Sequence, residues 1–275
     1  MYGPDVRRIL SRWPYPEAAV AAYSTAMTAA FGNSEARCEI ETAAADYEAG
    51  EEIDARALLA RMEELALDCG ISAYTMRMLP LIALLDTAEK KYSERGLSEE
   101  MFRNSFADLL WKTLECERFH GIWGSTAALW TWRFFEFRIF GLGRLQFEPV
   151  EFGGKAALSV HIPSSGPLIY ADCQDSYARA AEFFGFSRFF CDSWLLHPVC
   201  RGLPENSGIR RFASDYELQF VTDDPKFLDV WNIFGTAWTG DASALPADTS
   251  LRRLWREHLL SGGLPGRGSG LYESF

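Results

Sequence analysis

Three side chains whose types suit general-base or nucleophilic chemistry lie near the ends of two apolar segments. His161 comes shortly before Pro163, and Cys191 and Ser193 share one face of the second segment. A histidine titrates near neutral pH and can take a proton, while a thiol or hydroxyl beside a base can attack a carbonyl carbon. These residues are therefore candidate catalytic groups, and a Cys191–His161 pair is one form that the site could take.

Each of these residues also has a structural interpretation. A histidine in a strand can be held by hydrogen bonds within the sheet, and a buried cysteine in a strand usually behaves as a small apolar side chain. Cys191, His197 and Cys200 together form a loose set without the paired spacing of a zinc site. No metal site is therefore predicted.

The segment that must position these groups runs from Gly141 to Pro198. Apolar or alternating runs at Leu145–Phe152, Ala156–Ile162 and Phe189–Leu196 predict strands, and the spacing of Asp175–Phe184 predicts a helix. Two strands that are apolar on both faces and joined by a helix indicate a parallel pair buried inside a sheet. A site is then expected at the ends of those strands.

The N-terminal part of the chain has a helical pattern from Tyr15 to about Arg118, from which we expect four or five helices. The segment Trp123–Phe140 follows, and its many aromatic residues predict a packing helix between two domains. The predicted division is a helical domain over residues 1–120 and a sheet domain over residues 121–275, with 121–140 at the interface.

Composition argues against several classes of partner. The net charge is -11, from 27 basic and 38 acidic side chains, and no cluster of Lys and Arg favours nucleic acid or an anionic membrane surface. No apolar run approaches the roughly 20 residues of a membrane span. Six cysteines without close-paired spacing, and no visible secretory signal, favour reduced thiols in the cytoplasm.

Several phrases of the sequence carry a family resemblance. They are LGRLQFE, a strand ending in VHIP, CDSWLLHP, LPENSGIRRF and, earlier, MLPLIALLDTAEKKYSERGLSEE. With these phrases most of the chain resembles a group of bacterial acyltransferases whose last domain is GNAT-like and follows a helical domain. The resemblance implies an α+β protein, in which a helical N-terminal domain precedes a GNAT-like mixed α/β sheet domain.

The resemblance also implies a mechanism. In the GNAT fold two central parallel strands splay apart, and the pantetheine arm of an acyl donor enters between them. Here the splayed strands would be Leu158–Pro163 and Phe189–Pro198, with the N-terminus of helix Asp175–Phe184 facing the pyrophosphate of the donor. The donor would be acyl-CoA or the acyl-phosphopantetheine of a carrier protein, and an amine would be the acceptor. The implied donor-binding residues are Val160, Ile162, Ser164, Ser165, Gly166, Ser176, Asn206 and Ser207.

The loop before that helix departs from the family pattern. GNAT enzymes usually carry an Arg/Gln-rich glycine loop there, whereas this chain has PSSGPLIYADCQ, with no Lys or Arg between Lys155 and Arg179. Asp172 and Asp175 would place negative charge at the helix N-terminus, so weak binding of free coenzyme A is expected. Gly208 also stands where the family phrase has asparagine.

Three function classes remain open from the sequence. The first is a GNAT-like N-acyltransferase, and the second is a non-catalytic binding or scaffold protein that has lost the phosphate loop. The third is a thiol-dependent acyl hydrolase using Cys191. Neither the acceptor amine, the acyl chain nor the oligomeric state follows from the sequence.

Overall fold

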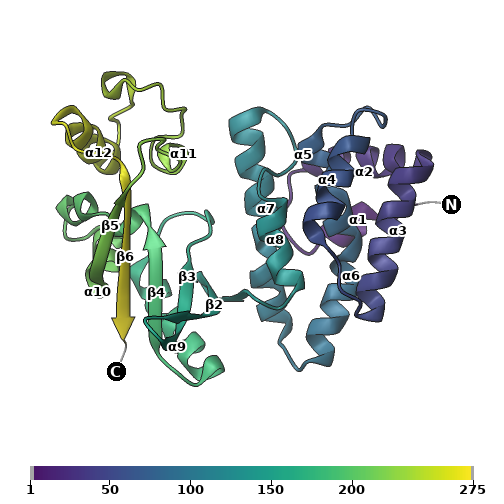
Figure 1. The fold of residues 1–275 in the computed structure, drawn as a ribbon, viewed down its shortest axis with the longest axis horizontal. Helices are drawn as coiled ribbons and strands as arrows, with labels where there is room; N and C mark the ends of the chain where they lie inside the picture. Colours follow the sequence, from purple (N-terminus) through teal and green to yellow (C-terminus); the bar gives the residue numbers. More distant parts are fainter. Residues whose placement is uncertain (1–2, 274–275) are drawn as a thin grey trace. The chain divides into compact units, whose positions relative to one another are not determined.

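The computed structural model describes residues 3–273 of the chain (Figure 1). The chain divides into two compact units, Met1–Gly141 and Leu142–Phe275. The division therefore follows Gly141 rather than residue 120, and the aromatic segment belongs to the first unit. Its predicted place at an interface between domains stays a prediction.

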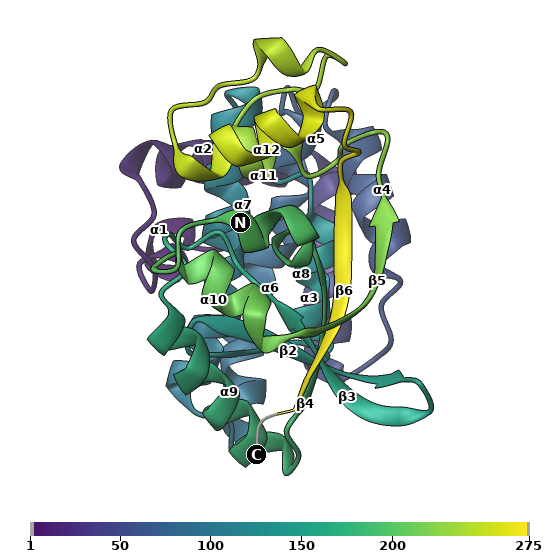
Figure 2. The same ribbon diagram turned by 90° about the vertical axis from the view of Figure 1, so that its left-hand side faces the viewer.

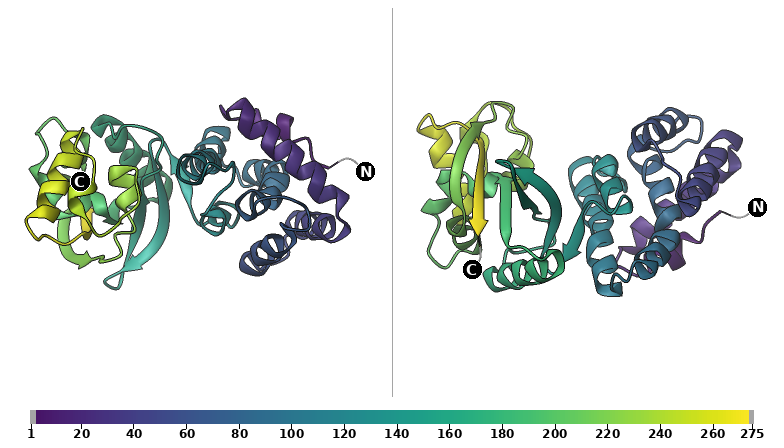
Figure 3. Two further views of the ribbon diagram at one scale, coloured as in Figure 1. Left: turned by 90° about the horizontal axis from the view of Figure 1, so that it is seen from above. Right: turned by 60° about the horizontal axis from the view of Figure 1, so that its bottom comes forward.

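The first unit is a bundle of helices, seen from two further directions in Figure 3. The helices are α1 (Val6–Leu10), α2 (Glu17–Gly32), α3 (Ser34–Ala49), α4 (Ala55–Leu65), α5 (Ala73–Met76), α6 (Met78–Glu94), α7 (Glu99–His120) and α8 (Ala128–Phe135). The described residues thus hold more helices than the four or five expected. The main omission is α3, because Asn33 ends α2 and also caps α3 by accepting hydrogen bonds from the N–H groups of Glu35 and Ala36.

Aromatic residues form the core of this unit between α6, α7 and α8. Phe106 of α7 lies 4.8 Å from Phe102 and 5.5 Å from Tyr92 of α6, measured between ring centroids. Phe135 of α8 meets Phe106 edge to face at 4.8 Å. The aromatic helix is shorter than the segment predicted for it, and its Phe134 and Phe135 are buried core residues.

The second unit is built on a mixed six-stranded sheet in the order β1-β2-β3-β4-β6-β5. The strands β2 to β6 are labelled in Figures 1 and 2. The strands are β1 (Phe140–Leu142), β2 (Leu145–Phe152), β3 (Lys155–His161), β4 (Arg188–Ser193), β5 (Glu217–Asp223) and β6 (Gly266–Glu273). β3 and β4 are parallel, whereas β2–β3, β4–β6 and β5–β6 are antiparallel. The predicted order of strand, strand, helix and strand and the parallel pair are confirmed.

Helix α9 (Tyr170–Phe184) makes the crossover between β3 and β4 and covers one face of the sheet. The ring of Tyr177 lies 4.7 Å from Phe189 of β4 and 6.1 Å from Phe147 of β2, between centroids. Tyr177 also shares a hydrogen bond of 2.8 Å with the hydroxyl of Tyr216, which comes just before β5. This aromatic layer fixes α9 against the strands that precede and follow it.

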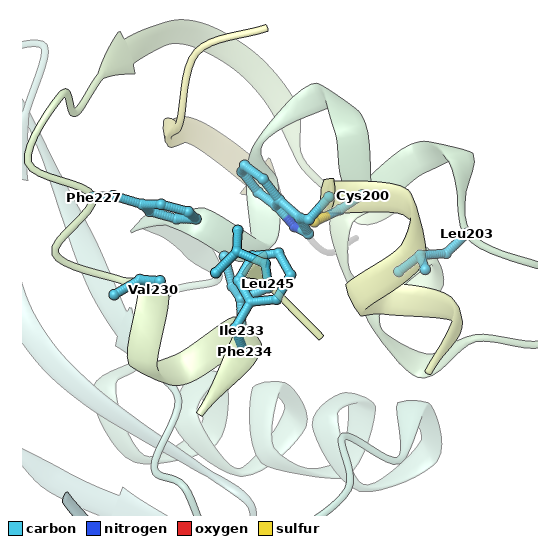
Figure 4. Packing of buried hydrophobic residues seen from close by; sticks show 8 residues of the cluster. Cys200, Leu203, Phe227, Val230, Ile233, Phe234 and Leu245 are labelled. Carbon is cyan, nitrogen blue, oxygen red and sulfur yellow. The ribbon is translucent and has the colours of Figure 1, made fainter. Parts of the chain in front are cut away.

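A second apolar cluster lies beyond the end of β4 (Figure 4). The elements of this region are two short 3₁₀ turns, η1 (Trp194–Leu196) and η2 (Pro198–Gly202), and then α10 (Gly208–Asp215), α11 (Val230–Phe234), η3 (Ala242–Ala244) and α12 (Ser250–Leu260). Trp255 of α12 is fully buried and packs with Phe227 and Cys200. Figure 1 shows α11 and α12 near the end of the sheet where β6 begins.

Candidate active site

The parallel pairing of β3 with β4 is short. It covers only Leu158↔Phe189 and Ser159↔Phe190, although β3 continues to His161 and β4 to Ser193. Each strand stays paired on its other side, β3 with β2 as far as His161 and β4 with β6 as far as Ser193. The two strands therefore part at their carboxyl ends, where facing backbone edges can hydrogen-bond an extended ligand. We call this opening the slot.

Val160 and Ile162, two predicted donor-binding residues, lie on the β3 side of the slot. Val160 is buried and Ile162, the first residue after β3, is half-buried. Both come after the last pair between β3 and β4. β4 therefore leaves the facing backbone groups of these two residues unpaired.

His161 lies beside a buried carboxylate that the sequence analysis missed. Its Nε2 is 3.5 Å from Oε2 of Glu148, a β2 residue that is 5% exposed. The antiparallel register places Gln146 opposite His161 and Glu148 opposite Ser159, so all four side chains share one face of the sheet. A histidine that ends a strand beside an opening can act as a general base for a proton that a substrate loses.

Cys191 lies on the opposite face of the sheet from His161. In the parallel β3–β4 pair Leu158 lies beside Phe189, so two residues further along Val160 lies beside Cys191. Side chains two residues apart share a face, and Tyr177 of α9 packs on Phe189, so Cys191 lies on the face that α9 covers. Cys191 is fully buried, and burial, with a smaller effect of Asp192, raises the pKa of its thiol well above the usual value. The Cys191–His161 dyad therefore does not form, and a nucleophilic Cys191 is not supported because the thiolate is the reactive species.

Ser193 ends β4 on the same face as Cys191. Its hydroxyl oxygen accepts a hydrogen bond of 3.2 Å from the N–H of Leu195 and thereby caps the turn η1. Ser193 is therefore occupied in turning the chain at the end of the slot. We retain it as a residue that shapes the slot and not as a nucleophile.

The N-terminus of α9 differs from the prediction. The helix begins at Tyr170, its N-cap is Ile169, and no side chain caps it. Asp175 lies more than one turn inside the helix and pairs with Arg179 at 2.7 Å, so only Asp172 remains as an acidic residue of the first turn. The expectation that two carboxylates occupy the helix N-terminus is therefore wrong, and the dipole there still favours an anion.

Arg144, in the turn between β1 and β2, holds the loop that joins β3 to α9. Its guanidinium donates to the carbonyl oxygen of Pro163 at 2.9 Å and to that of Gly166 at 3.1 Å. Burial lowers the pKa of Arg144, and Asp172 and Cys173 act in the opposite direction. A cation thus reaches this loop from another part of the sequence, even though the loop itself contains none.

Ser176, predicted to bind the donor, has a structural role instead. Its hydroxyl oxygen accepts the backbone N–H groups of Arg144 and Leu145, at 2.8 and 3.3 Å, and donates to the carbonyl oxygen of Asp172 at 2.7 Å. The side chain is fully buried. Gly143, with φ 75°, leaves room for this hydroxyl, since a Cβ there would lie 2.7 Å from it. Ser176 therefore anchors the turn that carries Arg144.

The remaining predicted loop residues lie at the surface beside Arg144. Ser164 and Gly166 are exposed and Ser165 is half-buried. Gly166 has φ 115°, a conformation that favours glycine. These three positions belong to the loop that leads into α9, and their role in donor binding stays a prediction.

An open pocket of about 350 Å³ lies next to the first residue of α9. It is lined by Tyr170, Glu205, Arg210, Arg211, Ser214 and Asp215. Asp215 accepts hydrogen bonds from the Tyr170 hydroxyl at 2.9 Å and from the amide of Gln174 at 2.7 Å, yet burial still raises its pKa. The pocket therefore combines two guanidinium groups with two carboxyl groups. Asp215 is tied to α9, and the carboxylate of Glu205 lies 3.7 Å from the guanidinium of Arg210.

The predicted binding residues Asn206 and Ser207 lie at the start of α10. Ser207 is the N-cap and accepts a hydrogen bond from the N–H of Arg210, whereas Asn206 is exposed. Gly208 follows, and a Cβ at this position would lie only 1.7 Å from the carbonyl oxygen of Leu168. Glycine is therefore required here by the close approach of α10 to the loop before α9.

Among the described residues, 3–273, no group of three or more His, Cys, Asp or Glu residues could hold a metal ion. Within the same range, no helix combines the length and the apolar character needed to cross a membrane.

Known proteins resemble the chain over nearly its full length. Residues 4–137 match the model of N-acyltransferase N-terminal domains, and residues 139–272 match that of GNAT-like C-terminal domains. A solved acyltransferase in complex with decanoyl-CoA and teicoplanin is 22% identical, with a TM-score of 0.79, covering 99% of this chain and 88% of that one. A mutant acyltransferase in complex with octanoyl-CoA is 21% identical, with a TM-score of 0.78 and the same coverage. Proteins with curated descriptions gave no match.

Proposed function

Because the chain belongs to the N-acyltransferase family, with an N-acyltransferase N-terminal domain followed by a GNAT-like C-terminal domain, we propose that it transfers an acyl group from acyl-CoA to an amine. The observation that carries this proposal is the slot between β3 and β4, with His161 and Glu148 beside it. Octanoyl-CoA and decanoyl-CoA, which the structurally similar acyltransferases hold, are the donors that we would test first.

The donor would lie along the parted strands. Its pantetheine arm would pair with the backbone of Val160 and Ile162, and its pyrophosphate would meet the N-terminus of α9. Arg144 would hold the loop of Ser164, Ser165 and Gly166 in place. The pocket beside Tyr170 would offer Arg210 and Arg211 to the phosphate groups.

The reaction would be a direct attack on the thioester. The nitrogen of the neutral amine forms a bond to the carbonyl carbon, and His161 takes the proton that the nitrogen loses. The carbon–sulfur bond then breaks, and the sulfur leaves as a thiolate that is protonated by solvent. Glu148 would place a negative charge beside the ring that takes the proton, since its Oε2 lies 3.5 Å from Nε2 of His161.

Calorimetry and a transfer assay test the proposal together. Octanoyl-CoA should bind with a dissociation constant in the low micromolar range, about -8 kcal/mol, and release of free thiol should depend on an added amine. Tight binding without turnover for any amine would favour the non-catalytic binding protein. Weak binding of coenzyme A together with transfer from an acylated carrier protein would show that the acyl donor is a carrier protein rather than acyl-CoA.

A further inference from the structure

Gln146 places a buried amide without a hydrogen-bond partner beside the candidate base. The residue is 2% exposed, and its Nε2 makes no hydrogen bond within the structure. It lies opposite His161 in the antiparallel β2–β3 pair. Side chains of such a pair have Cβ atoms about 4.5–5.5 Å apart on the same face of the sheet. The amide therefore lies on the same face of the sheet as the imidazole of His161 and next to it.

An unsatisfied buried amide destabilises a protein, so its presence at this position needs a reason. The same unit shows what a structural glutamine looks like: the amide of Gln174 donates to Asp215 at 2.7 Å and accepts from the Tyr272 hydroxyl at 3.5 Å. Gln146 has no such partners, although it lies among the polar side chains of Glu148 and His161. A partner that arrives with a substrate would supply the missing acceptor.

We propose that Gln146 donates a hydrogen bond to an oxygen of the acceptor close to its reacting amine, and so selects amines that carry such an oxygen. This inference rests on the proposed function. Gln146 lies on β2, whereas the slot for the donor lies on the other side of β3, and His161 lies between them. The hydrogen-bond partner of the Gln146 amide is therefore the acceptor and not the donor. Gln146 is thus a specificity-determining residue.

The variant Gln146→Met tests this role, since methionine has a similar shape and removes the amide. Its transfer activity would be compared with two matched amines, trans-2-aminocyclohexanol and cyclohexylamine, which differ by one hydroxyl. We expect the parent protein to favour the amino alcohol in kcat/KM by about tenfold, and Gln146→Met to lose this preference through a higher KM for the amino alcohol. The dissociation constant of octanoyl-CoA should not change.

Thermal melting without substrates provides a second measurement. Gln146→Met should melt about 2–4 °C above the parent, because an unsatisfied amide has been removed. The control Gln174→Met removes an amide that has partners and should melt lower than the parent.

Unchanged discrimination between the two amines, or a lower melting temperature for Gln146→Met, would overturn the role of Gln146. In that case, acyl transfer by the parent protein would leave the proposed function standing. A parent protein that acylates neither amine nor any other acceptor would overturn both.

Discussion

His161 and Glu148 lie on neighbouring strands with 3.5 Å between the imidazole Nε2 and the carboxylate Oε2. The carboxylate is almost completely buried, and the histidine ends β3 beyond its last pair with β4. A buried carboxylate needs a compensating charge or hydrogen bonds, and an imidazole that accepts a proton supplies positive charge nearby. Because this pair lies beside the slot, substitution of either residue should change the rate of acyl transfer.

Replacement of the candidate base gives the first prediction. His161→Ala should lower acyl transfer by ~10²-fold or more with little change in stability, as expected for loss of a general base. Paired melting and transfer assays measure both quantities. A purely structural His161 would give the reverse pattern, with a stability loss of ~1–3 kcal/mol and parental turnover.

Neutralisation of its partner gives the second prediction. Glu148→Gln keeps the shape of the side chain but removes the charge that stabilises the imidazolium, so turnover should fall roughly tenfold, equivalent to about 1.4 kcal/mol. The loss should appear in kcat, with the dissociation constant of octanoyl-CoA unchanged. Combination with His161→Ala should cost little more than His161→Ala alone, because the two residues act as a unit. If the activity losses of the two single variants added up in the double variant, the two residues would act independently of each other.

The pocket beside α9 provides the third prediction. Arg211→Gln removes an exposed guanidinium from its lining and should weaken coenzyme A binding by about tenfold, as expected for one charge-assisted hydrogen bond to phosphate. Arg253→Gln is the matched control, since Arg253 is an exposed residue of α12 that does not line the pocket. Equal effects of the two substitutions in calorimetry would place the phosphates elsewhere.

Gly208 provides the fourth prediction. Gly208→Ala would bring a Cβ to 1.7 Å from the carbonyl oxygen of Leu168, so the loop before α9 or the start of α10 must move. We expect a stability loss of about 1–3 kcal/mol in urea unfolding, together with weaker coenzyme A binding. Gly32→Ala is the control, because a Cβ at Gly32 would meet no atom within 4 Å. If Gly208→Ala kept the parental stability and coenzyme A binding, the loop before α9 could move to accommodate the Cβ without loss of free energy.

The fifth prediction concerns pH and the buried His197. Burial, aided by His258, lowers the pKa of His197 to about 4, while Asp223 acts in the opposite direction. The folded state therefore binds fewer protons than the unfolded state between pH 6.5 and 4. The contribution of the neutral His197 ring to the free energy of unfolding is fully present above about pH 6.5. It is lost as the pH falls toward 4, by roughly 3 kcal/mol in total.

His197→Asn tests this dependence because an asparagine oxygen can still accept the N–H of Val199, which His197 binds through Nδ1 at 3.4 Å. Urea unfolding at pH 7 and pH 5 should show a smaller loss of stability for the variant than for the parent. Parallel losses in both proteins would assign the acid sensitivity to other groups.

The strands and the parallel crossover could be predicted because their apolar runs have strand length and are separated by a helical pattern. The face on which Cys191 points could not be predicted, since it depends on the register Leu158↔Phe189, which no local pattern determines. Glu148 was missed for a related reason. It lies in a strand that alternates apolar and polar residues, and only the pairing of β2 with β3 brings it to His161.

The start of α9 shows a different limit. The sequence pattern places Asp172 and Asp175 at the N-terminus of the predicted helix, but the helix begins at Tyr170 with no side-chain cap. Without that usual sequence signal the start of the helix cannot be located from the sequence. The cation at the loop was equally hidden, because Arg144 reaches Pro163 and Gly166 from a turn that precedes them in the chain.

The position of β6 between β4 and β5 has a consequence for the order of folding. Helices of the first unit form from contacts between residues close in sequence, whereas β4 must wait for residues 266–273 before it is paired on its second side. During synthesis the helical unit can therefore fold while the ribosome is still adding the sheet, and the binding slot matures last. In stopped-flow refolding, we expect helical circular dichroism to recover before octanoyl-CoA binding, and simultaneous recovery would contradict this order.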